Sequence, residues 1–305
     1  MVRPARFGFN PETAASNAFQ TAPGAAAPGR VAEAAADALR EFDVLAAQLQ
    51  RAGVAVIVGE DTPAPAKPDA VFPNNWVSFH RDGTVVLYPM LAPNRRLERR
   101  EDLLRQVTAE GGFRITRTVD LTHREIQGKF LEGTGSMVLD RVNRIAYACL
   151  SPRTDLDALG EFAQLLDYEL VTFDAVDAQG VAIYHTNVLM AIGSRFAVLC
   201  SDVIRDPGSR AALTEKLAGT GHRVIEISTV QMGRFAGNVL ELAAPTGRVI
   251  ALSSNAWGSL DAGQRRSLEG EGSVVAADIP VIERLGGGGV RCMLAEILLP
   301  KRVVS

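Results

Sequence analysis

Three side chains in this sequence, a cysteine, a histidine and a glutamate, are of the types that together form a thiol-nucleophile site. Cys292 follows a run of four glycines at 286–289, which we expect to present the thiol beside an open loop. His185 stands where an apolar strand is expected to begin, and Glu132 precedes a glycine-rich turn. A thiolate attacks an electrophilic carbon, a histidine transfers protons, and a carboxylate orients the imidazole or a substrate N–H. Taken alone, each residue also fits simple packing or a turn.

A second group of polar side chains is available to hold a substrate near that thiol. Its members are Asp69, Asn74, Asn75, Arg95, Arg96, Arg153 and Asn187. The acid and the first two amides surround a proline-fixed bend, and Arg153 comes just after a predicted strand. Asparagine pairs and prolines also form ordinary turns, and the basic run at 95–100 fits one face of a helix, so residue type alone leaves both roles open.

Composition excludes several classes of protein. The 305 residues carry a net charge of −3 with acids and bases interspersed, so nothing indicates nucleic-acid binding. No apolar run approaches the roughly 20 residues of a membrane span, and the N-terminus lacks the apolar core of a signal peptide. Three cysteines and four scattered histidines show no metal-ligand spacing. We therefore expect a cytoplasmic protein with no metal and no membrane contact.

Hydrophobic periodicity predicts alternating strands and helices along the whole chain. Helices are expected at about 30–52, 96–110, 155–166, 209–217 and 261–268. Strands are expected at 54–58, 84–88, 114–119, 135–140, 144–148, 170–174, 187–192, 196–199, 223–227, 239–242, 249–252, 273–276 and 293–297, with a hairpin turn at 81–84 and a mobile loop at 21–29. Strand–strand–helix–strand units of 50–60 residues, repeated about five times, predict a radial or barrel-like α/β repeat. Without a linker or a change in composition, residues 1–305 are expected to form one domain.

Several segments resemble a known superfamily. They are Arg3-Pro4, Phe9-Asn10-Pro11-Glu12-Thr13, Asn17-Ala18-Phe19-Gln20 and 68–76, together with the ordered glutamate, histidine and C-terminal cysteine. The chain resembles the guanidine-modifying (pentein, or amidinotransferase-like) superfamily, and within it the arginine-deiminase-related branch named citrulline utilisation hydrolase. The similarity runs from the first residues to Cys292. It implies a five-bladed α/β propeller of ββαβ units without a cofactor, and it is compatible with a homodimer.

The resemblance also implies catalytic roles. Cys292 would attack the central carbon of a guanidino or ureido group. His185 would protonate the leaving nitrogen and later activate water against the covalent adduct. As an imidazolium, the same histidine would lower the pKa of the thiol, with help from N–H groups of the glycine-rich backbone. Glu132 would accept hydrogen bonds from the terminal nitrogens of the substrate.

Substrate-binding roles follow from the same resemblance. Asp69 matches an acid that precedes the substrate-binding pair by five residues in the dimethylarginine hydrolases, and it is taken as a substrate-binding candidate. Arg153 resembles the arginine that binds the α-carboxylate of the amino acid, for which a bidentate guanidinium is suited. Arg95 or Arg96 is a second candidate for that carboxylate. The loop near Gly24 would serve as a lid.

Three amides mark where this sequence departs from the superfamily. In enzymes that act on a cationic guanidinium, the positions of Asn75 and Asn187 are typically aspartates, and that of Asn74 is often an acid. A buried guanidinium without these charges would lack compensation, whereas a neutral ureido group needs both the donors and the acceptors of an amide. The leading hypothesis is therefore citrulline, cleaved to ornithine, ammonia and carbon dioxide. The retained Asp69 and Glu132 keep an arginine-type substrate open.

Three alternatives stand beside that hypothesis. Two are enzymatic: deimination of arginine or a methylarginine, and amidino transfer to an acceptor amine. The third is a non-catalytic protein whose pocket binds an amino acid. Faster alkylation of Cys292 than of Cys149 and Cys200, both expected in the core, would separate an enzyme from a binding protein.

Overall fold

The structure is a computed structural model that describes residues 1–22 and 28–302. The loop predicted at 21–29, and the lid suggested near Gly24, fall largely on residues 23–27, outside this description. Helix α2 (Pro28–Arg51) already includes the last two residues of that predicted loop.

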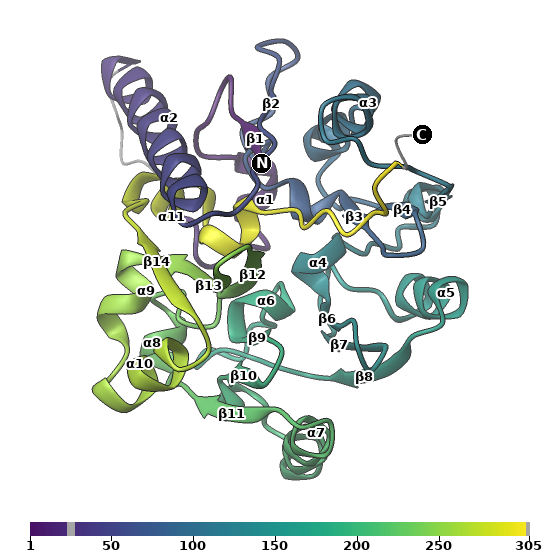
Figure 1. The fold of residues 1–305 in the computed structure, drawn as a ribbon, viewed down its shortest axis with the longest axis vertical. Helices are drawn as coiled ribbons and strands as arrows, with labels where there is room; N and C mark the ends of the chain where they lie inside the picture. The colour runs from purple at the N-terminus through teal and green to yellow at the C-terminus, as the bar shows by residue number, and fades with distance from the viewer. Residues whose placement is uncertain (23–27, 303–305) are drawn as a thin grey trace.

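Four three-stranded sheets repeat one pattern around the middle of the molecule (Figure 1). In each sheet, two strands pair in antiparallel order and a third, reached through a helical connection, runs parallel to the middle one. The four are β3 (Val77–Phe79), β4 (Thr84–Leu87) and β5 (Arg117–Asp120); β6 (Val138–Asp140), β7 (Ile145–Cys149) and β8 (Glu169–Phe173); β9 (Met190–Ile192), β10 (Phe196–Leu199) and β11 (Arg223–Glu226); and β12 (Leu240–Ala244), β13 (Gly247–Ser253) and β14 (Ser273–Ala277). A separate parallel pair joins β1 (Val2–Arg3) to β2 (Gly59–Glu60). The fold is thus mixed α/β with small sheets, and four units of the predicted strand–strand–helix–strand type are present in the described ranges.

Longer helices such as α2, α3, α5 and α7 lie on the outside of this ring, and the one-turn helices α1, α4 and α6 lie toward its middle (Figure 1). The α-helices besides α2 are α1 (Pro11–Ala14), α3 (Glu101–Ala109), α4 (Gly133–Ser136), α5 (Leu156–Leu166), α6 (Thr186–Leu189), α7 (Pro207–Gly219), α8 (Thr229–Met232), α9 (Ser254–Ser259), α10 (Ala262–Glu269) and α11 (Pro280–Gly286). The 3₁₀ helices are η1 (Pro73–Asn75), η2 (Pro93–Glu98), η3 (Thr122–Gln127), η4 (Ser201–Val203) and η5 (Val290–Met293). A parallel strand pair requires such a crossover, and α5 shows how the sequence provides it. The Asp155 side chain caps its first turn, Phe162 is buried, and Asp167 ends it in a left-handed conformation.

Four strand predictions and one helix prediction need correction. No strand is formed at 54–58 or 293–297, and the strands expected from 135 and 187 begin instead as the one-turn helices α4 and α6. The helix expected at 96–110 is divided into η2 and α3. Apolar periodicity reports that a side chain is buried, whereas a strand also requires a backbone partner. The apolar residues of 54–58 and 293–297 pack against the core without one.

His80 is a buried histidine of the fold and lies outside the predicted site. Its Nε2 is 2.8 Å from Ser78 Oγ, and burial, with Arg141 nearby, lowers its pKa to about 3. Because an unfolded histidine titrates near pH 6.5, the unfolded chain binds one more proton than the folded chain below that pH. The stability that neutral His80 contributes is therefore present above pH 6.5 and is lost as the pH falls toward 3.

We expect His80→Asn to flatten the acid side of the stability curve. Between pH 6 and 4 the free energy of unfolding of the wild type should fall more steeply than that of the variant, by up to about 1.4 kcal/mol per pH unit. Urea denaturation at several pH values measures both slopes, and every other titrating group is common to the two proteins. Equal slopes would contradict the assignment.

Candidate active site

Short helices and turns just before the first strand of each sheet bring the polar residues together. Asn75 ends η1 before β3, Glu132 precedes α4 and β6, and His185 precedes α6 and β9. Asn238 comes just before β12 in the same way. Since the strands lie around a common middle, the residues that precede them meet there (Figure 1). Helix η5, which carries Cys292, packs against η1 and β13.

Two glycines after Glu132 allow this close assembly. A Cβ atom on Gly133, whose φ is 49°, would lie 2.3 Å from the carbonyl oxygen of Asn74. A Cβ atom on Gly135 would lie 2.3 Å from Asn75 Nδ2 and 2.7 Å from His185 Nδ1. Side chains at either position would push the elements apart, so the glycine-rich turn is needed for the backbones to approach.

Six of the predicted residues line one small cavity. They are Asp69, Asn75, Arg95, Arg153, His185 and Cys292, joined by Asn17, Phe72, Tyr184 and glycines 286–288. Its free volume is about 10 Å³, since the surrounding side chains nearly fill it. Cys292 is only 3% exposed, so the predicted open loop is instead a closed, buried setting.

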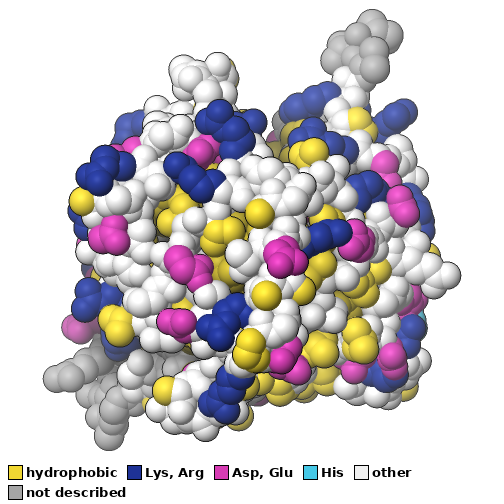
Figure 2. Space-filling model, turned by 90° about the horizontal axis from the view of Figure 1, so that it is seen from below, with side chains coloured by type: hydrophobic (Ala, Val, Ile, Leu, Met, Phe, Trp, Pro, Cys, Tyr) yellow, Lys and Arg dark blue, Asp and Glu magenta, His cyan; other side chains and the backbone are white. Residues whose placement is uncertain are grey.

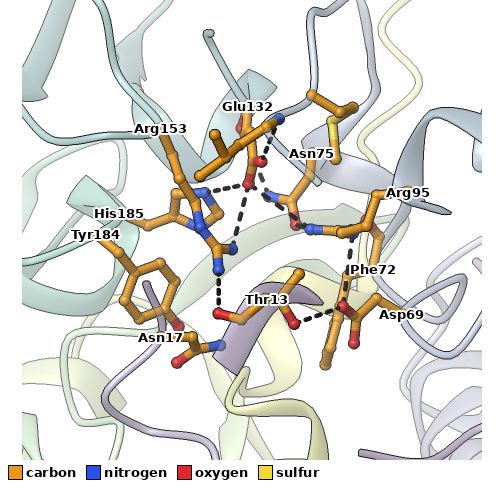
Figure 3. Close-up of polar contacts among 12 residues, drawn as sticks. Thr13, Asn17, Asp69, Phe72, Asn75, Arg95, Glu132, Arg153, Tyr184 and His185 are labelled. Atoms are coloured by element: carbon orange, nitrogen blue, oxygen red, sulfur yellow. Dashed lines mark hydrogen bonds and ion pairs between the residues drawn. The ribbon is translucent and has the colours of Figure 1, made fainter. Parts of the chain in front are cut away.

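Glu132 and His185 form a buried pair at this cavity (Figure 3). Glu132 Oε2 lies 2.8 Å from His185 Nε2 and 3.4 Å from Arg153 Nη1. Burial opposes ionisation of the carboxyl, but Arg153 and His185 outweigh it and hold the pKa of Glu132 well below its ordinary value. Burial lowers the pKa of His185 to about 4 despite that carboxylate. At neutral pH the pair is therefore a carboxylate and a neutral imidazole.

The sulfur of Cys292 faces two amides. Asn238 Nδ2 lies 3.3 Å from Sγ and Asn187 Nδ2 lies 3.5 Å from it, while no hydrogen bond to His185 is found among the described residues. Burial raises the pKa of the Cys292 thiol, and the amide of Asn238 opposes the shift. The prediction that imidazolium His185 lowers this pKa is wrong for this arrangement, because Glu132 takes the imidazole and burial keeps it neutral.

Arg95 connects Asn75 to the buried carboxylates (Figure 3). Its guanidinium donates to both oxygens of Glu98, at 2.9 and 3.0 Å, and its Nη1 donates to Asn75 Oδ1 at 3.0 Å. Asp69 Oδ2 and Glu132 Oε2 each lie 3.7 Å from it. Burial raises the pKa of Glu98 to about 7 even though Arg95 lies beside it.

The N-terminal segment closes the cavity from another direction. Asn10 Nδ2 and Thr13 Oγ1 donate to Asp69 Oδ2 at 2.7 and 3.2 Å. The Arg153 guanidinium donates to the carbonyl oxygen of Thr13 at 2.9 Å and to Ser16 Oγ at 2.8 and 3.0 Å. Asp69 and Arg153 therefore bind the first helical turn, α1, and the residues after it, as well as facing the cavity.

Four predicted residues lie outside the cavity lining. Glu132 and Asn187 contact lining side chains, His185 and Cys292 respectively, whereas Asn74 and Arg96 do not take part in this way. Asn74 is buried behind the lining, and neither atom of its amide has a partner among the described residues. Arg96 donates to the carbonyl oxygen of Met90, pairs with Glu125 at 3.3 Å and covers the ring of Phe130. Arg96 is therefore not placed to bind a substrate carboxylate in this cavity, because its guanidinium is held by Met90, Glu125 and Phe130.

Sequence reasoning missed Asn238 and Glu98, which contact Cys292 and Arg95 respectively. Asn238 had a detectable signal: a polar residue after a glycine, directly before an apolar strand, at the place in its repeat that Asn75 and His185 occupy in theirs. Glu98 had none, because it is a single acid within the basic run at 95–100.

The described residues contain no cluster of His, Cys, Asp and Glu placed to hold a metal ion. Within the same ranges, no helix has both the length and the apolar character needed to cross a bilayer. Figure 2 shows acidic and basic side chains interspersed over one face of the molecule, without the broad basic surface that nucleic acid would require.

The sequence matches the family described as N,N dimethylarginine dimethylhydrolase, eukaryotic, over residues 3–299. Among solved structures, the substrate-bound N-terminal domain of ArgZ, an arginine dihydrolase from the ornithine–ammonia cycle in cyanobacteria, matches 98% of this chain and 98% of its own, with TM-score 0.71 and 19% identity. Unliganded AgrE matches 99% of this chain but 39% of its own, with TM-score 0.73 and 20% identity. A dimethylarginine dimethylaminohydrolase in an adduct with S-methyl-L-thiocitrulline covers 96% of both chains, with TM-score 0.61 and 15% identity. No curated protein sequence matches. At these identities the solved structures establish a shared fold.

Proposed function

This chain belongs to the N,N dimethylarginine dimethylhydrolase family, within the guanidine-modifying superfamily, and we propose that its own substrate is L-citrulline, which it hydrolyses to ornithine, ammonia and carbon dioxide. As a member of that family, the chain is a hydrolase that acts on C–N bonds. In the proposal Cys292 is the nucleophile, His185 carries protons, and Glu132 holds the imidazole. No cofactor takes part.

The proposed reaction has two stages. The thiol proton of Cys292 passes to neutral His185 as the sulfur bonds to the ureido carbon, and His185 then protonates the terminal nitrogen, which leaves as ammonia. A thiocarbamate remains on the sulfur. Water, deprotonated by His185, adds to the same carbon, the C–S bond breaks, and the sulfur regains a proton. The carbamate of ornithine that is released loses carbon dioxide.

The orientation of the Asn75 amide is the observation that favours a ureido substrate over a guanidinium. An arginine side chain only donates hydrogen bonds. The Asn75 atom that lies 3.0 Å from Arg95 Nη1 must therefore be the acceptor, Oδ1. Nδ2 donates one hydrogen to the carbonyl oxygen of Glu132 at 3.5 Å, and its second N–H is proposed to face the substrate. An N–H donor matches the oxygen of a ureido group, which a guanidinium lacks, and it would stabilise negative charge that develops there.

Arg153 is proposed to bind the amino-acid end of the substrate, with its guanidinium paired to the α-carboxylate. For this to happen the contacts of Arg153 with Thr13 and Ser16 must open, because the present free volume is too small for an amino acid. The proposal therefore includes a movement of the segment around α1 when substrate binds. Asn187 is proposed to donate a hydrogen bond to the sulfur of Cys292, and Asp69 is proposed to accept one from the substrate amine.

Arginine is the second candidate, favoured by the charges around the cavity. Three buried carboxylates, Asp69, Glu98 and Glu132, face two buried guanidinium groups, Arg95 and Arg153. Because the pKa of Glu98 is raised to about 7, the cluster gains a surplus negative charge as Glu98 ionises above neutral pH, and a cationic substrate would compensate that charge.

Product analysis with L-citrulline and L-arginine side by side tests the proposal, with Cys292→Ser as the blank. Ornithine and ammonia from citrulline alone would support it. Citrulline accumulating from arginine would identify a deiminase, and ornithine from both substrates would identify an enzyme that performs both hydrolyses. No product from either would leave another guanidino or ureido compound, amidino transfer, or a binding protein.

Asn75→Asp is expected to shift preference from citrulline toward arginine. The carboxylate loses the N–H donor, and it adds negative charge that suits a guanidinium. We expect kcat/KM for citrulline to fall by roughly 10- to 100-fold, the value of one hydrogen bond to a charged group. The ratio of kcat/KM for the two substrates is the measurement. Asn143→Asp, the same change at an exposed turn, should leave the ratio unaltered, whereas an unaltered ratio in Asn75→Asp would contradict the assignment.

The proposal extends to the fold and the setting of the enzyme. The four repeated units, with the β1–β2 pair in the fifth position, are proposed to be the blades of a five-bladed propeller. Residues 1–305 are proposed to form one catalytic domain that works in the cytoplasm. A homodimer is its proposed assembly, and light scattering at micromolar concentration would test it.

A further inference from the structure

Asn238 lies closer to the sulfur of Cys292 than any other polar side chain hydrogen-bonded to it in the described ranges. Its side chain is 1% exposed, and Nδ2 donates to the carbonyl oxygen of Asn187 at 2.9 Å as well as to Sγ at 3.3 Å. The bond to the Asn187 carbonyl fixes which end of the amide faces the sulfur, because a carbonyl can only accept. The second amide, Nδ2 of Asn187, approaches Sγ at 3.5 Å. The sulfur thus lies between two N–H donors.

Three unusual backbone features converge on this contact. Phe235, three residues earlier, has φ of 63°, a left-handed conformation that is strained for a residue with a bulky side chain. A Cβ atom on Gly237 would lie 2.4 Å from the carbonyl oxygen of Val188, so only glycine lets this segment pack against α6. A Cβ atom on Gly289 would lie 2.7 Å from Asn238 Oδ1. The backbone on both sides of the contact is shaped to bring the amide to the sulfur.

The sulfur needs such donors because its usual partner is engaged elsewhere. His185 hydrogen-bonds Glu132, and its buried imidazole is neutral at pH 7. Burial raises the pKa of the Cys292 thiol. The hydrogen bond from Asn238 has the largest effect in the opposite direction, and the charge of Arg291 has the next largest. A thiolate accepts hydrogen bonds more strongly than a thiol, so N–H donation favours the ionised form.

We infer that Asn238 is a catalytic residue, whose side-chain N–H stabilises the negative charge of the Cys292 sulfur. When the S–H bond breaks, its electron pair stays on sulfur and faces the amide, while the proton passes to the neutral imidazole of His185. The same donor assists when the C–S bond breaks and the sulfur leaves as a thiolate. The inference rests on the proposed function in taking Cys292 as the nucleophile, yet the acidity of its thiol can be measured without any substrate.

The test measures the rate of alkylation of Cys292 by iodoacetamide as a function of pH, read by peptide mass spectrometry in the full-length protein. The midpoint of the profile gives the thiol pKa, whereas a change in access would alter only its plateau. In Asn238→Ala we expect the midpoint to rise by about one pH unit, which lowers the rate at pH 7 about tenfold. Asn238→Asp, of the same shape but with an acceptor and negative charge at the sulfur, should raise it further. Cys149 and Cys200 serve as internal references.

Asn255→Ala is the matched control, because it also removes an amide that donates to a buried acceptor, Glu283 Oε2, away from the sulfur. Its Cys292 profile should equal that of the wild type. An unmoved midpoint in both Asn238 variants would overturn the inference, and the isosteric Asn238→Asp keeps the test available if the alanine variant does not fold. If the wild type hydrolyses neither citrulline nor arginine while the midpoint still depends on Asn238, the proposed function fails and this inference stands.

Discussion

Cys292→Ser is expected to abolish turnover while the substrate still binds. A hydroxyl in place of the thiol is far harder to ionise, and the base that the proposal assigns to it is His185, whose pKa burial has lowered to about 4. We expect kcat to fall by roughly four orders of magnitude or more, as loss of a covalent nucleophile does in other enzymes. Stopped-time ammonia release measures the rate, and isothermal titration calorimetry measures binding to the variant.

Cys200→Ser provides the matched control for that change. The same atom is exchanged in a thiol that is fully buried in a different core cluster, among Leu199, Val203 and their neighbours. It should keep its activity even if its melting temperature drops. Substantial turnover by Cys292→Ser would rule out the covalent mechanism, and equal losses in both variants would point to unfolding instead.

Glu132→Gln is expected to lower kcat by roughly 10²- to 10⁴-fold, the range for losing a group that positions an acid–base catalyst. The amide is nearly isosteric but uncharged. It would no longer stabilise a proton on His185, which must form an imidazolium during the reaction, and it would leave Arg95 and Arg153 with less compensation in a buried site. Steady-state kinetics from pH 5 to 9 measure the effect, with thermal unfolding as a check on the fold.

Glu125→Gln removes a partly buried carboxylate from outside the cavity. Glu125 pairs with Arg96 and Arg99 and accepts from the Met90 N–H, so its loss tests the cost of breaking a partly buried ion pair as such. We expect a lower melting temperature and a rate within about threefold of the wild type, since no contact to the reacting groups is lost. A near-wild-type rate in Glu132→Gln would reduce Glu132 to a turn residue.

Much of the element order was predictable because hydrophobic periodicity is local. The helices at α5, α7 and α10 and the strands β4, β7, β8, β10, β11, β13 and β14 lie within a few residues of their predicted positions. The failures share one cause. At 54–58 and 293–297, apolar residues pack against the core without forming a strand, and before β6 and β9 a single helical turn intervenes. Whether a buried segment finds a backbone partner depends on the rest of the chain.

The candidate site was predictable in membership and less so in arrangement. Cys292, His185 and Arg153, among others, do line one cavity, and Glu132 contacts it. Arg96, next to Arg95, does not, because successive residues of a 3₁₀ helix point in different directions and only the pattern of burial selects one. In the same way, Asn75 lines the cavity and its neighbour Asn74 does not.

By itself, the sequence determined the repeated α/β units and supplied the side chains on which the proposed chemistry depends: a thiol, an imidazole, a carboxylate and several amides. Only the tertiary structure decided which of these groups meet. His185 pairs with Glu132, 53 residues away, and Cys292 faces Asn187 and Asn238, at separations of 105 and 54 residues. Such contacts depend on how separate units close around a middle, and on the burial that sets each pKa there. No local pattern of residues encodes either quantity.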